Sequence, residues 1–323
     1  MPAIDILMAA YNGERYISEQ IESILSQTFT DWRLLIRDDG STDNTPAIIE
    51  DYAAKYPGKI EIVHDDAVCR RPEKNFFELL KHAEADYVMF SDQDDYWLKY
   101  KIQITLDYIK DAELENPEKP VMVFTGLEVV DAELKSTGEL MSLEFPERRY
   151  SFRELLAGNY AAGCTQMLNR ECYEGMGRFQ EGIFMHDWWA SLYASAFGVI
   201  VRVPMALILY RQNGNNSIGA GKNYPRGIER LIKILKNPIK KARNRIHITK
   251  SIILHYRRMN SVFRSRYYES LNSAKKNDCD DYNRMFSGNI FARFSLVRTM
   301  YYFSNLSKMD TIGRLLWIFL PRP

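Results

Sequence analysis

The strongest constraint on the fold is an alternation of short apolar runs and helical patterns across residues 1–110. Four runs are typical of buried strands: "AIDILMAA", "WRLLIRDDG", "KIEIVHDD" and "DYVMFSD". Between them lie a helical pattern through Ile17, Ile21 and Ile24, a second that starts at Thr45 with Pro46 in the first helical position, and "EKNFFELLKHAEA". This alternation predicts an α/β fold with a mainly parallel sheet and helices on both faces.

Residues 111–221 show a more mixed pattern that we assign to the same domain. The predicted strands are "VMVFTGLEVV", a segment near "CTQMLN", "VIVRV" and "ALILYRQ", and the predicted helices are "SFRELLAG" and "FMHDWWASLYASAFG". No linker rich in Pro, Gly or Ser separates this part from residues 1–110. We therefore predict one domain over residues 1–221, a boundary near "NGNNSIGAGKNYPRG", and a helical region over residues 222–323.

The charge of the chain divides at the same boundary. Residues 222–323 contain 22 Lys and Arg against 6 Asp and Glu, a net charge of +16, whereas residues 1–221 carry 21 against 36, a net charge of −15. Amphipathic basic helices with apolar faces, ending in "TIGRLLWIFLPRP", favour contact with an anionic membrane surface. Packing on the acidic body or an interface between copies of the chain is the alternative. No zinc-finger, helix-turn-helix or RNP signature indicates nucleic acid.

Composition limits the compartment and the chemistry. The chain has 323 residues, of which 46% are hydrophobic, and this is typical of a folded soluble protein. Its four cysteines show neither CxxC spacing nor metal-ligand pairing with the five histidines, so we expect no disulfide framework and no zinc site. The N-terminus has no signal-peptide pattern, and no window is long and apolar enough to span a membrane. These features predict a cytoplasmic protein.

Three polar clusters follow the predicted strands at the points where the strands end. They are Tyr11-Asn12-Gly13, Asp38-Asp39-Gly40-Ser41 and Asp92-Gln93-Asp94-Asp95. In an open parallel sheet the carboxyl ends of the strands share one edge and the ligand crevice lies there, so we expect the clusters to converge. The D-x-D in the last cluster suits Mg²⁺ or Mn²⁺ with a diphosphate, whereas a solvated acidic turn that caps a helix near Leu98 is the alternative.

These motifs together resemble the family 2 inverting glycosyltransferases of the GT-A fold. The segments that carry the resemblance are "AAYNGERYISEQIESILSQTF", "DDGSTDNT", "NFF" and "SDQDDYW", and it covers roughly residues 3–215. The later segments "HDWWASLYASAFG" and "YRQNGNNSIGA" resemble more narrowly the bacterial rhamnosyltransferase branch. The resemblance implies a Rossmann-like α/β fold with a mixed, mainly parallel sheet flanked by helices, followed here by a C-terminal helical extension.

The resemblance also implies roles for residues of the nucleotide pocket. The expected nucleotide-binding residues are Tyr11, Asn12, Glu14, Asp39, Arg71, Asn75 and Asp92. Asp39 would accept a hydrogen bond from the N3–H of uracil or thymine, and Asp92 would contact the ribose. Arg71 and Asn75 would reach the base or the phosphates, with a solvated loop Arg as the alternative. Asp94 would be the main protein ligand of the metal, with Asp95 beside it.

An inverting transfer also needs a carboxylate that deprotonates the acceptor hydroxyl. The resemblance places this base at Asp187 in "MHDWW", while Trp188 and Trp189 would stack on a sugar ring and His186 would neighbour the acceptor. The alternatives are that Asp187 only caps the helix, that the tryptophans belong to the core, and that His186 is a loop residue.

The chain departs from the related branch at one motif. Asn213 in "YRQNGNN" stands where that branch carries a histidine, and an amide binds a metal only weakly. Arg211 in the same motif is a candidate clamp for the diphosphate, with a structural role at the strand end as the alternative.

These observations predict a metal-dependent inverting glycosyltransferase that uses Mn²⁺ or Mg²⁺. The expected donor is dTDP-rhamnose, and the expected acceptor is a lipid-linked saccharide. We expect the protein to act at the inner face of a bacterial cell membrane, and it could also form a homo-oligomer. The rivals are a transferase that uses a UDP-hexose and an inactive sugar-binding or scaffolding protein. A nucleotidyltransferase is disfavoured because "AAYNGERY" lacks a Gly-rich phosphate loop with a lysine.

Overall fold

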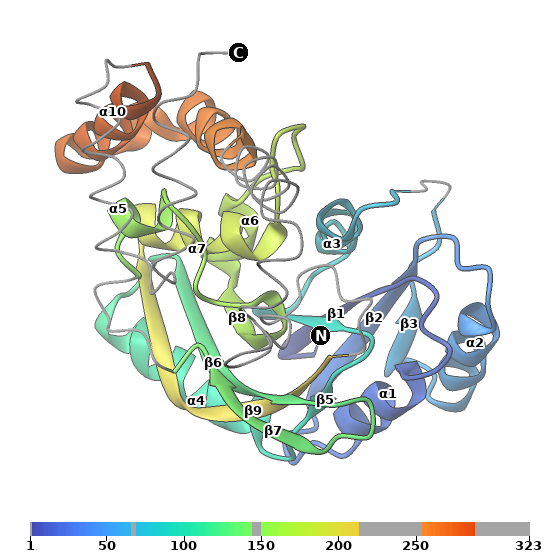
Figure 1. The fold of residues 1–323 in the computed structure, drawn as a ribbon. Helices are drawn as coiled ribbons and strands as arrows, with labels where there is room; N and C mark the ends of the chain where they lie inside the picture. The colour runs from blue at the N-terminus through green and yellow to red at the C-terminus, as the bar shows by residue number, and fades with distance from the viewer. Residues whose placement is uncertain (1, 66–68, 144–149, 213–253, 288–323) are drawn as a thin grey trace, which may run out of the picture. The chain divides into compact units, whose positions relative to one another are not determined.

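A computed structural model describes residues 2–65, 69–143, 150–212 and 254–287 (Figure 1). The chain divides into two compact units. The first comprises Met1–Ser151 with Asn159–Ser217, and the second comprises Phe152–Gly158 with Ile218–Pro323. The predicted boundary near residue 221 and the separate roles of the two regions remain predictions.

The first unit begins with the predicted alternation of strands and helices. Its elements are β1 (Ile4–Ala10), α1 (Ile17–Leu25), β2 (Trp32–Asp38), α2 (Thr45–Lys55), β3 (Ile60–Ile62), α3 (Pro72–Leu80) and β4 (Tyr87–Asp92). The four strands pair in parallel in the order β3-β2-β1-β4. The chain passes from β1 to β2 and β3 on one side, and later adds β4 on the other side of β1. The strand order therefore reverses at β1, and a ligand crevice is expected at such a switch point.

The helices form where the sequence places apolar residues at helical spacing. In α1, Ile17, Ile21 and Ile24 are fully buried. In α2, Pro46 lies in the first turn, where its missing N–H costs no hydrogen bond, and Asn44 is the N-cap residue. The helix therefore starts at Thr45, as predicted, with its N-terminal end close to the end of β1.

The second half of the sheet mixes strand directions. β8 (Gln166–Asn169) pairs antiparallel with β4 and with β6 (Val121–Val130), and β9 (Val199–Arg211) pairs parallel with β6. Two further strands were not predicted. β5 (Tyr96–Trp97) pairs antiparallel with β9, and β7 (Ser136–Met141) pairs antiparallel with β6. The helices of this half are α4 (Lys101–Glu115), α6 (Arg170–Gly175), also not predicted, and α7 (His186–Phe197), and η2 (Gly163–Thr165) is a single 3₁₀ turn.

The prediction of two strands over 199–212 was wrong, because β9 is one continuous strand. Its register against β6 shifts between Phe124, which pairs with Arg202, and Gly126, which pairs with Ala206. The irregularity accommodates Pro204, which is exposed and has no N–H to donate to the ladder. The strand therefore continues past Pro204, which lies between the two segments that were predicted as separate strands.

The described part of the second unit is helical. It contains α5 (Phe152–Leu155), a helix over 254–267, η3 (Tyr268–Ser270) and α10 (Ser273–Ser287). Met259 and Phe263 are fully buried, and the Phe263 ring lies 5.6 Å from that of Phe152. Residues 222–253 and 288–323 of the predicted basic helical region lie outside the described residues. Within the described residues, no helix combines the length and the apolarity needed to cross a bilayer.

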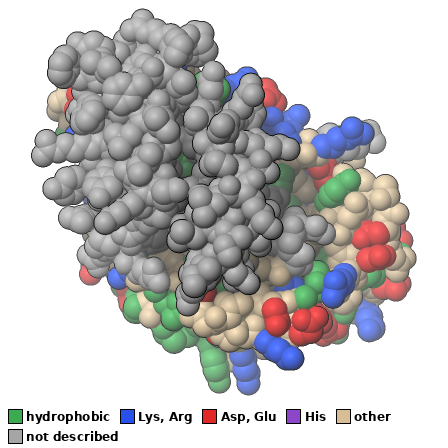
Figure 2. All heavy atoms as spheres, viewed as in Figure 1, with side chains coloured by type: hydrophobic (Ala, Val, Ile, Leu, Met, Phe, Trp, Pro, Cys, Tyr) green, Lys and Arg blue, Asp and Glu red, His purple; other side chains and the backbone are tan. Residues whose placement is uncertain are grey.

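Charged side chains of both signs are interspersed on the face of the molecule shown in Figure 2. They lie over the end of the sheet that carries α1 and α2, where Lys and Arg alternate with Asp and Glu. The net negative charge of residues 1–221 is therefore not gathered into one acidic patch on this part of the visible face.

A buried carboxylate ties the parallel strands together below this edge. Asp5, in β1, is fully buried and accepts hydrogen bonds from Arg33 Nε at 2.9 Å and Arg33 Nη2 at 3.0 Å. The backbone N–H groups of Glu84 and Ala85 donate to the same carboxylate at 2.7 and 3.0 Å. Asp5 therefore joins β1, β2 and the segment that leads into β4.

We expect Asp5→Ala to lower the free energy of unfolding by about 3–5 kcal/mol, because it leaves a largely buried guanidinium and two N–H groups without their acceptor. Urea unfolding of the purified protein measures this. The control is Glu61→Ala, which removes a second acidic partner of Arg33, at 3.3 Å, whose side chain is 43% exposed. That change should cost less than about 1 kcal/mol, and equal losses for the two variants would contradict the role given to Asp5.

Candidate active site

Two of the three predicted polar clusters are joined directly by hydrogen bonds. The Tyr11 N–H donates to Gln93 Oε1 at 2.8 Å, and Gln93 Nε2 donates back to the Tyr11 carbonyl at 2.8 Å. Gly13 makes this approach possible, since a Cβ there would lie 2.3 Å from Gln93 Oε1. The ends of β1 and β4 are therefore held together, and the Tyr11 side chain stays 53% exposed above them.

The loop after β1 is joined in the same way to the loop after β2. The Asn12 N–H donates to Ser41 Oγ at 2.8 Å, and Asn12 Oδ1 accepts from the Thr42 N–H at 2.8 Å. Asn12 adopts a φ of 48°, which asparagine tolerates better than most residues. Glu14 Oε2 accepts from the Asn44 N–H at 2.9 Å. All three predicted clusters therefore converge on one edge of the sheet.

Asp39 lies at this edge but is already engaged by the chain. It is 4% exposed, and its carboxylate accepts from the N–H groups of Cys69 at 2.6 Å and Arg70 at 2.5 Å. Arg37 Nη1 also donates to it at 3.3 Å. A base N3–H would add a fourth donor to a carboxylate that accepts about four hydrogen bonds at most.

Asn75 and Arg71 likewise have partners within the protein. Asn75 is 2% exposed, and its Oδ1 accepts from Arg37 Nη1 at 3.0 Å. Arg71 Nε lies 2.9 Å from Glu73, and its Nη1 donates to Glu181 at 3.2 Å. Asn75 therefore supports the loop that carries Asp39, and Arg71 is directed toward acidic side chains.

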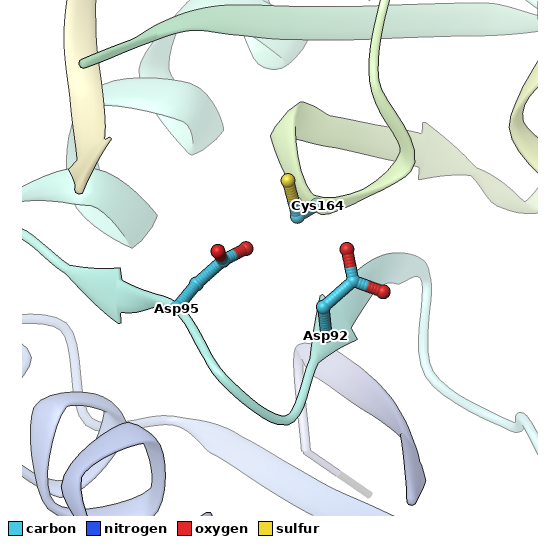
Figure 3. A group of neighbouring side chains, drawn as sticks. All are labelled: Asp92, Asp95 and Cys164. Atoms are coloured by element: carbon cyan, nitrogen blue, oxygen red, sulfur yellow. The ribbon is translucent and has the colours of Figure 1, made fainter. Parts of the chain in front are cut away.

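The carboxylates after β4 meet a cysteine from η2. Figure 3 shows the side chains of Asp92, Asp95 and Cys164 facing one another, and one ligand atom from each lies within 4.8 Å of the others. Burial, with the charges of Asp94 and Asp187, raises the pKa of Asp92 to about 7. Burial, with the charges of Asp92 and Asp94, also raises the pKa of Asp95. Asp187 is near enough for its charge to contribute to this rise in the pKa of Asp92.

A buried lysine lies on the far side of this cluster. Lys101, the first residue of α4, is fully buried, and its Nζ lies 3.6 Å from the centroid of the Trp97 ring. Burial lowers the pKa of Lys101 to about 7, while the Cys164 and Asp95 groups act to raise it. A buried lysine therefore lies near the acids, and the sequence motifs did not reveal it.

Arg211, at the end of β9, holds the same turn in place. Its Nε donates to the Asp94 carbonyl at 3.0 Å, its Nη1 donates to the Ala132 carbonyl, and its Nη2 donates to Glu19. The guanidinium also lies 4.3 Å from the centroid of the Tyr16 ring. The side chain is 1% exposed, so the structural alternative fits Arg211 better than a clamp on the diphosphate. Asn213 lies outside the described residues.

The candidate base lies at the start of α7. Asp187 is 8% exposed, and its Oδ1 accepts from the Trp188 N–H at 2.7 Å. Burial raises the pKa of Asp187 to about 6, and hydrogen bonds from Trp188, Gly163 and Asn159 oppose that rise. The N-cap of α7 is Met185, so Asp187 does not cap the helix but lies in its first turn, where the positive end of the helix favours a carboxylate. Its role as the base remains a prediction.

The neighbours of Asp187 pack mainly as core residues. Trp188 and Trp189 are buried, and the Trp189 indole N–H donates to the Met176 carbonyl at 2.9 Å. Packing therefore accounts for the tryptophans better than an open surface for stacking on a sugar. His186 is 3% exposed and stacks on Phe76 with centroids 3.8 Å apart, and burial lowers the pKa of His186 to about 3. It is therefore a neutral imidazole.

The residues present fit a divalent cation at this group of carboxylates, where ligand atoms of Asp92 and Asp95 lie within 4.8 Å of each other. Asp92 and Asp94 are both partly exposed, repel one another and offer the hard oxygen ligands that Mg²⁺ and Mn²⁺ prefer. Burial, together with the charges of Asp95 and Asp92, raises the pKa of the Cys164 thiol, and a neutral thiol is a poor ligand. A candidate metal group at this strand end is therefore supported.

Several residues of the site were not predicted from the sequence. Gln93 lies inside the acidic motif but reads as a spacer, and Gly163 and Cys164 lie in "AAGCTQ", which carries no spacing signal. Lys101 reads as an ordinary helix residue. Only their contacts reveal them, because each acts through a segment that is distant in the sequence.

Comparison with known proteins identifies the class to which this site belongs. Residues 5–174 match the profile of Glycosyl transferase family 2. The dTDP-rhamnosyl transferase RfbG of Shigella flexneri is 30% identical over 237 residues, which cover 69% of this chain and 78% of that protein. The uncharacterized glycosyltransferase RT0329 of Rickettsia typhi is 27% identical over 58% of this chain and 57% of its own length. The chain belongs to Glycosyl transferase family 2.

Solved structures support the same fold. S. aureus TarS 1–349 in complex with UDP matches with a TM-score of 0.53 at 18% identity, over 98% of this chain and 80% of TarS 1–349. The complex of TarS 1–349 with UDP-GlcNAc gives 0.52 at 17% identity, over 90% and 81%. The predicted GT-A α/β fold, with its mixed, mainly parallel sheet and helical C-terminal part, is confirmed.

We expect Gly163→Ala to reduce the rate of glycosyl transfer at least tenfold while the protein stays folded. A Cβ at Gly163 would lie 2.7 Å from His186 Nε2 and 3.3 Å from Asp187 Cβ, so the base would be displaced. Initial rates with the active donor measure the effect, and circular dichroism checks the fold. Gly158→Ala is the control, because a Cβ there meets only Tyr256 Oη at 4.0 Å. Equal rates for both variants would contradict the positioning role of Gly163.

Proposed function

We propose that this protein is a metal-dependent inverting glycosyltransferase that moves L-rhamnose from dTDP-rhamnose onto a saccharide acceptor. The observation that carries the proposal is the single site shared by Asp187, Asp92 and Asp94, in which the charges of Asp94 and Asp187 help raise the pKa of Asp92. The rhamnosyl donor rests on the likeness to the Shigella flexneri dTDP-rhamnosyl transferase.

Asp187 has the properties of the general base in this reaction. It deprotonates the acceptor hydroxyl that attacks the anomeric carbon, while the nucleoside diphosphate leaves from the opposite face of the sugar. Its buried position raises the pKa of Asp187 to about 6, which suits proton abstraction near neutral pH better than an ordinary aspartate does. The hydrogen bond from the Trp188 N–H keeps the carboxylate oriented.

Asp92 and Asp94 are the residues that would hold Mn²⁺ or Mg²⁺. When bound, such an ion stabilises the negative charge that develops on the diphosphate as it leaves. Arg211 positions the turn that carries Asp94 and Asp95, because its Nε donates to the Asp94 carbonyl and its backbone N–H donates to Asp95 at 3.3 Å.

The nucleotide would lie over the ends of β1 and β2. The exposed Tyr11 ring offers a face for the base, and Asn12 and Glu14 shape the loop below it. Asp39 binds the base in this proposal through its remaining acceptor position. Arg71 and Asn75 then support that pocket, in keeping with their contacts to Glu181 and Arg37.

A UDP-hexose donor is the second candidate. The likeness to TarS in complex with UDP and with UDP-GlcNAc concerns the fold alone, yet it shows that this fold accepts a uracil nucleotide in a relative. The acceptor in our proposal is a lipid-linked saccharide, reached by peripheral membrane contact of the basic region after Lys222. The alternative is that the same basic region forms an interface between copies of the chain in a homo-oligomer.

The experiment that tests the proposal is a donor screen with purified full-length protein and a lipid-linked saccharide acceptor. We expect release of dTDP from dTDP-rhamnose in the presence of Mn²⁺, and loss of activity with EDTA that Mn²⁺ restores. Release of UDP from a UDP-hexose would favour the second candidate. Absence of transfer from every donor, with nucleotide binding retained, would favour the inactive sugar-binding protein.

We expect Asp187→Asn to lower kcat by at least about a hundredfold with little change in the KM for the donor, since a general base contributes roughly 10²–10⁴ in rate. The wild-type rate should fall as the pH decreases through about 6, because protonation of Asp187 removes the base. A cation bound nearby would favour the charged carboxylate and would move this fall to a lower pH. Rates measured between pH 5 and 8 test this. A flat profile in the wild type would contradict the assignment of the base.

A further inference from the structure

Gln166 lies next to the candidate base, at a position of the sheet that would accept an apolar side chain. It is the first residue of β8, it is fully buried, and the next two residues of the strand are Met167 and Leu168. Among the described residues its Oε1 has no hydrogen-bond partner. A buried polar atom without a partner lowers stability, so packing alone does not explain a glutamine here.

The amide nitrogen of Gln166 joins the two segments that meet at Asp187. Its Nε2 donates to the Ala161 carbonyl at 3.0 Å, just before η2, and to the Asp187 carbonyl at 3.1 Å, in the first turn of α7. Ser191 Oγ, one turn further along α7, lies 3.3 Å from the same nitrogen. One side chain of the sheet therefore ties the segment 159–163 to the start of the helix.

Asn159 and Ser191 complete this hydrogen-bond network. Asn159 Nδ2 donates to the Ala161 carbonyl at 2.8 Å, and Asn159 Oδ1 accepts from Ser191 Oγ at 3.0 Å. The Ser191 hydroxyl also lies 2.9 Å from the Asp187 carbonyl, as an alternative acceptor. A Cβ at Gly163, in the same segment, would lie 3.3 Å from Asp187 Cβ, so the segment 159–163 packs directly against the base.

We propose that Gln166 is a positioning residue for the base, because it holds the segment 159–163 against the first turn of α7 and thereby orients the Asp187 carboxylate toward the acceptor hydroxyl. This inference rests on the proposed function, since it takes Asp187 as the base. Asn159 and Gly163, which donate to the carboxylate, belong to the segment that Gln166 holds. Small errors in the placement of a catalytic group lower a rate steeply. Gln166 contacts the main chain of Asp187 and acts through it.

A purely structural role for Gln166 is the competing explanation. In that case the loss of its amide would lower the stability of the protein, and the rate per folded molecule would stay unchanged. In our proposal the loss lowers kcat more than stability, because an apolar replacement also removes the unpartnered Oε1. The KM for the donor should stay unchanged, since the expected nucleotide-binding residues lie outside β8 and α7.

The first test compares Gln166→Met with Leu168→Met in the full-length protein, using the active donor and a lipid-linked saccharide acceptor. Gln166→Met should lower kcat at least about fivefold and leave the KM for the donor within about twofold. Its Tm should change by less than about 3 °C. Leu168→Met, a change of similar volume at a buried position of the same strand, should leave kcat within about twofold. An unchanged kcat in folded Gln166→Met, or a loss confined to KM, would overturn the proposal.

The second test asks whether the effect requires the base. In the Asp187→Asn background, Gln166→Met should change the remaining rate by less than about twofold, because the group that it positions is absent. Equal fold losses in the two backgrounds would overturn the proposal. Should Gln166→Met not fold, Ser191→Ala replaces it, since it removes the hydroxyl between Gln166 and Asn159. It should lower kcat about two- to threefold when Asp187 is present, and an unchanged kcat would count against the network.

A third measurement does not depend on activity. In Gln166→Met, hydrogen–deuterium exchange should become at least about fivefold faster in peptides that cover residues 159–165 and 186–192, because the link between these segments is lost. Leu168→Met should leave both peptides unchanged, and unchanged exchange in Gln166→Met would overturn the proposal. If the wild-type protein transferred no sugar from any donor, the proposed function would fail, and exchange alone would decide whether Gln166 fixes the surroundings of Asp187.

Discussion

The parallel pairing of β1 with both β2 and β4 is the constraint on which the site depends. The register sets Ala10 opposite Asp38 and Ala9 opposite Asp92, so the three strands end together and their loops must share one edge. Backbone hydrogen bonds fix this arrangement before any side chain of the site is considered. The reciprocal contact between Tyr11 and Gln93 then closes the gap between the loops, and Gly13 is the residue that lets them approach.

Bringing acids to one edge creates an electrostatic problem that the protein meets in three ways. Asp39 is neutralised within the chain by Arg37 and by backbone donors. Asp95 is fully buried, and its carboxylate accepts a hydrogen bond from the Arg211 N–H. Asp92 and Asp94 remain on the partly exposed side, where their mutual repulsion can be relieved by a cation. One short segment of sequence therefore yields carboxylates with different roles, because the surroundings of each one differ.

Local patterns predicted most of the sheet and the position of the site, since hydrophobic periodicity and strand-end clusters are short-range signals. They failed where the outcome depends on distant partners. Pro204 reads as a break, yet an irregular register with β6 carries β9 past it. Arg211 reads equally well as a ligand for phosphate and as a structural residue, and only its contacts with Asp94 and Glu19 distinguish the two. Trp188 and Trp189 follow the predicted base Asp187 but pack in the core, which burial alone reveals.

The contacts of Arg211 also bear on the order in which the site forms. This side chain joins the Asp94 carbonyl, 117 positions earlier in the chain, and Glu19, 192 positions earlier. A nascent chain that ends shortly after Asp95 would contain the acids that follow β2 and β4, but neither Asp187 nor the arginine that fixes the turn after β4. Contacts of such long range form late because the loop they close is entropically expensive. This edge of the sheet would therefore be complete only after β9 has been synthesised and has paired with β6.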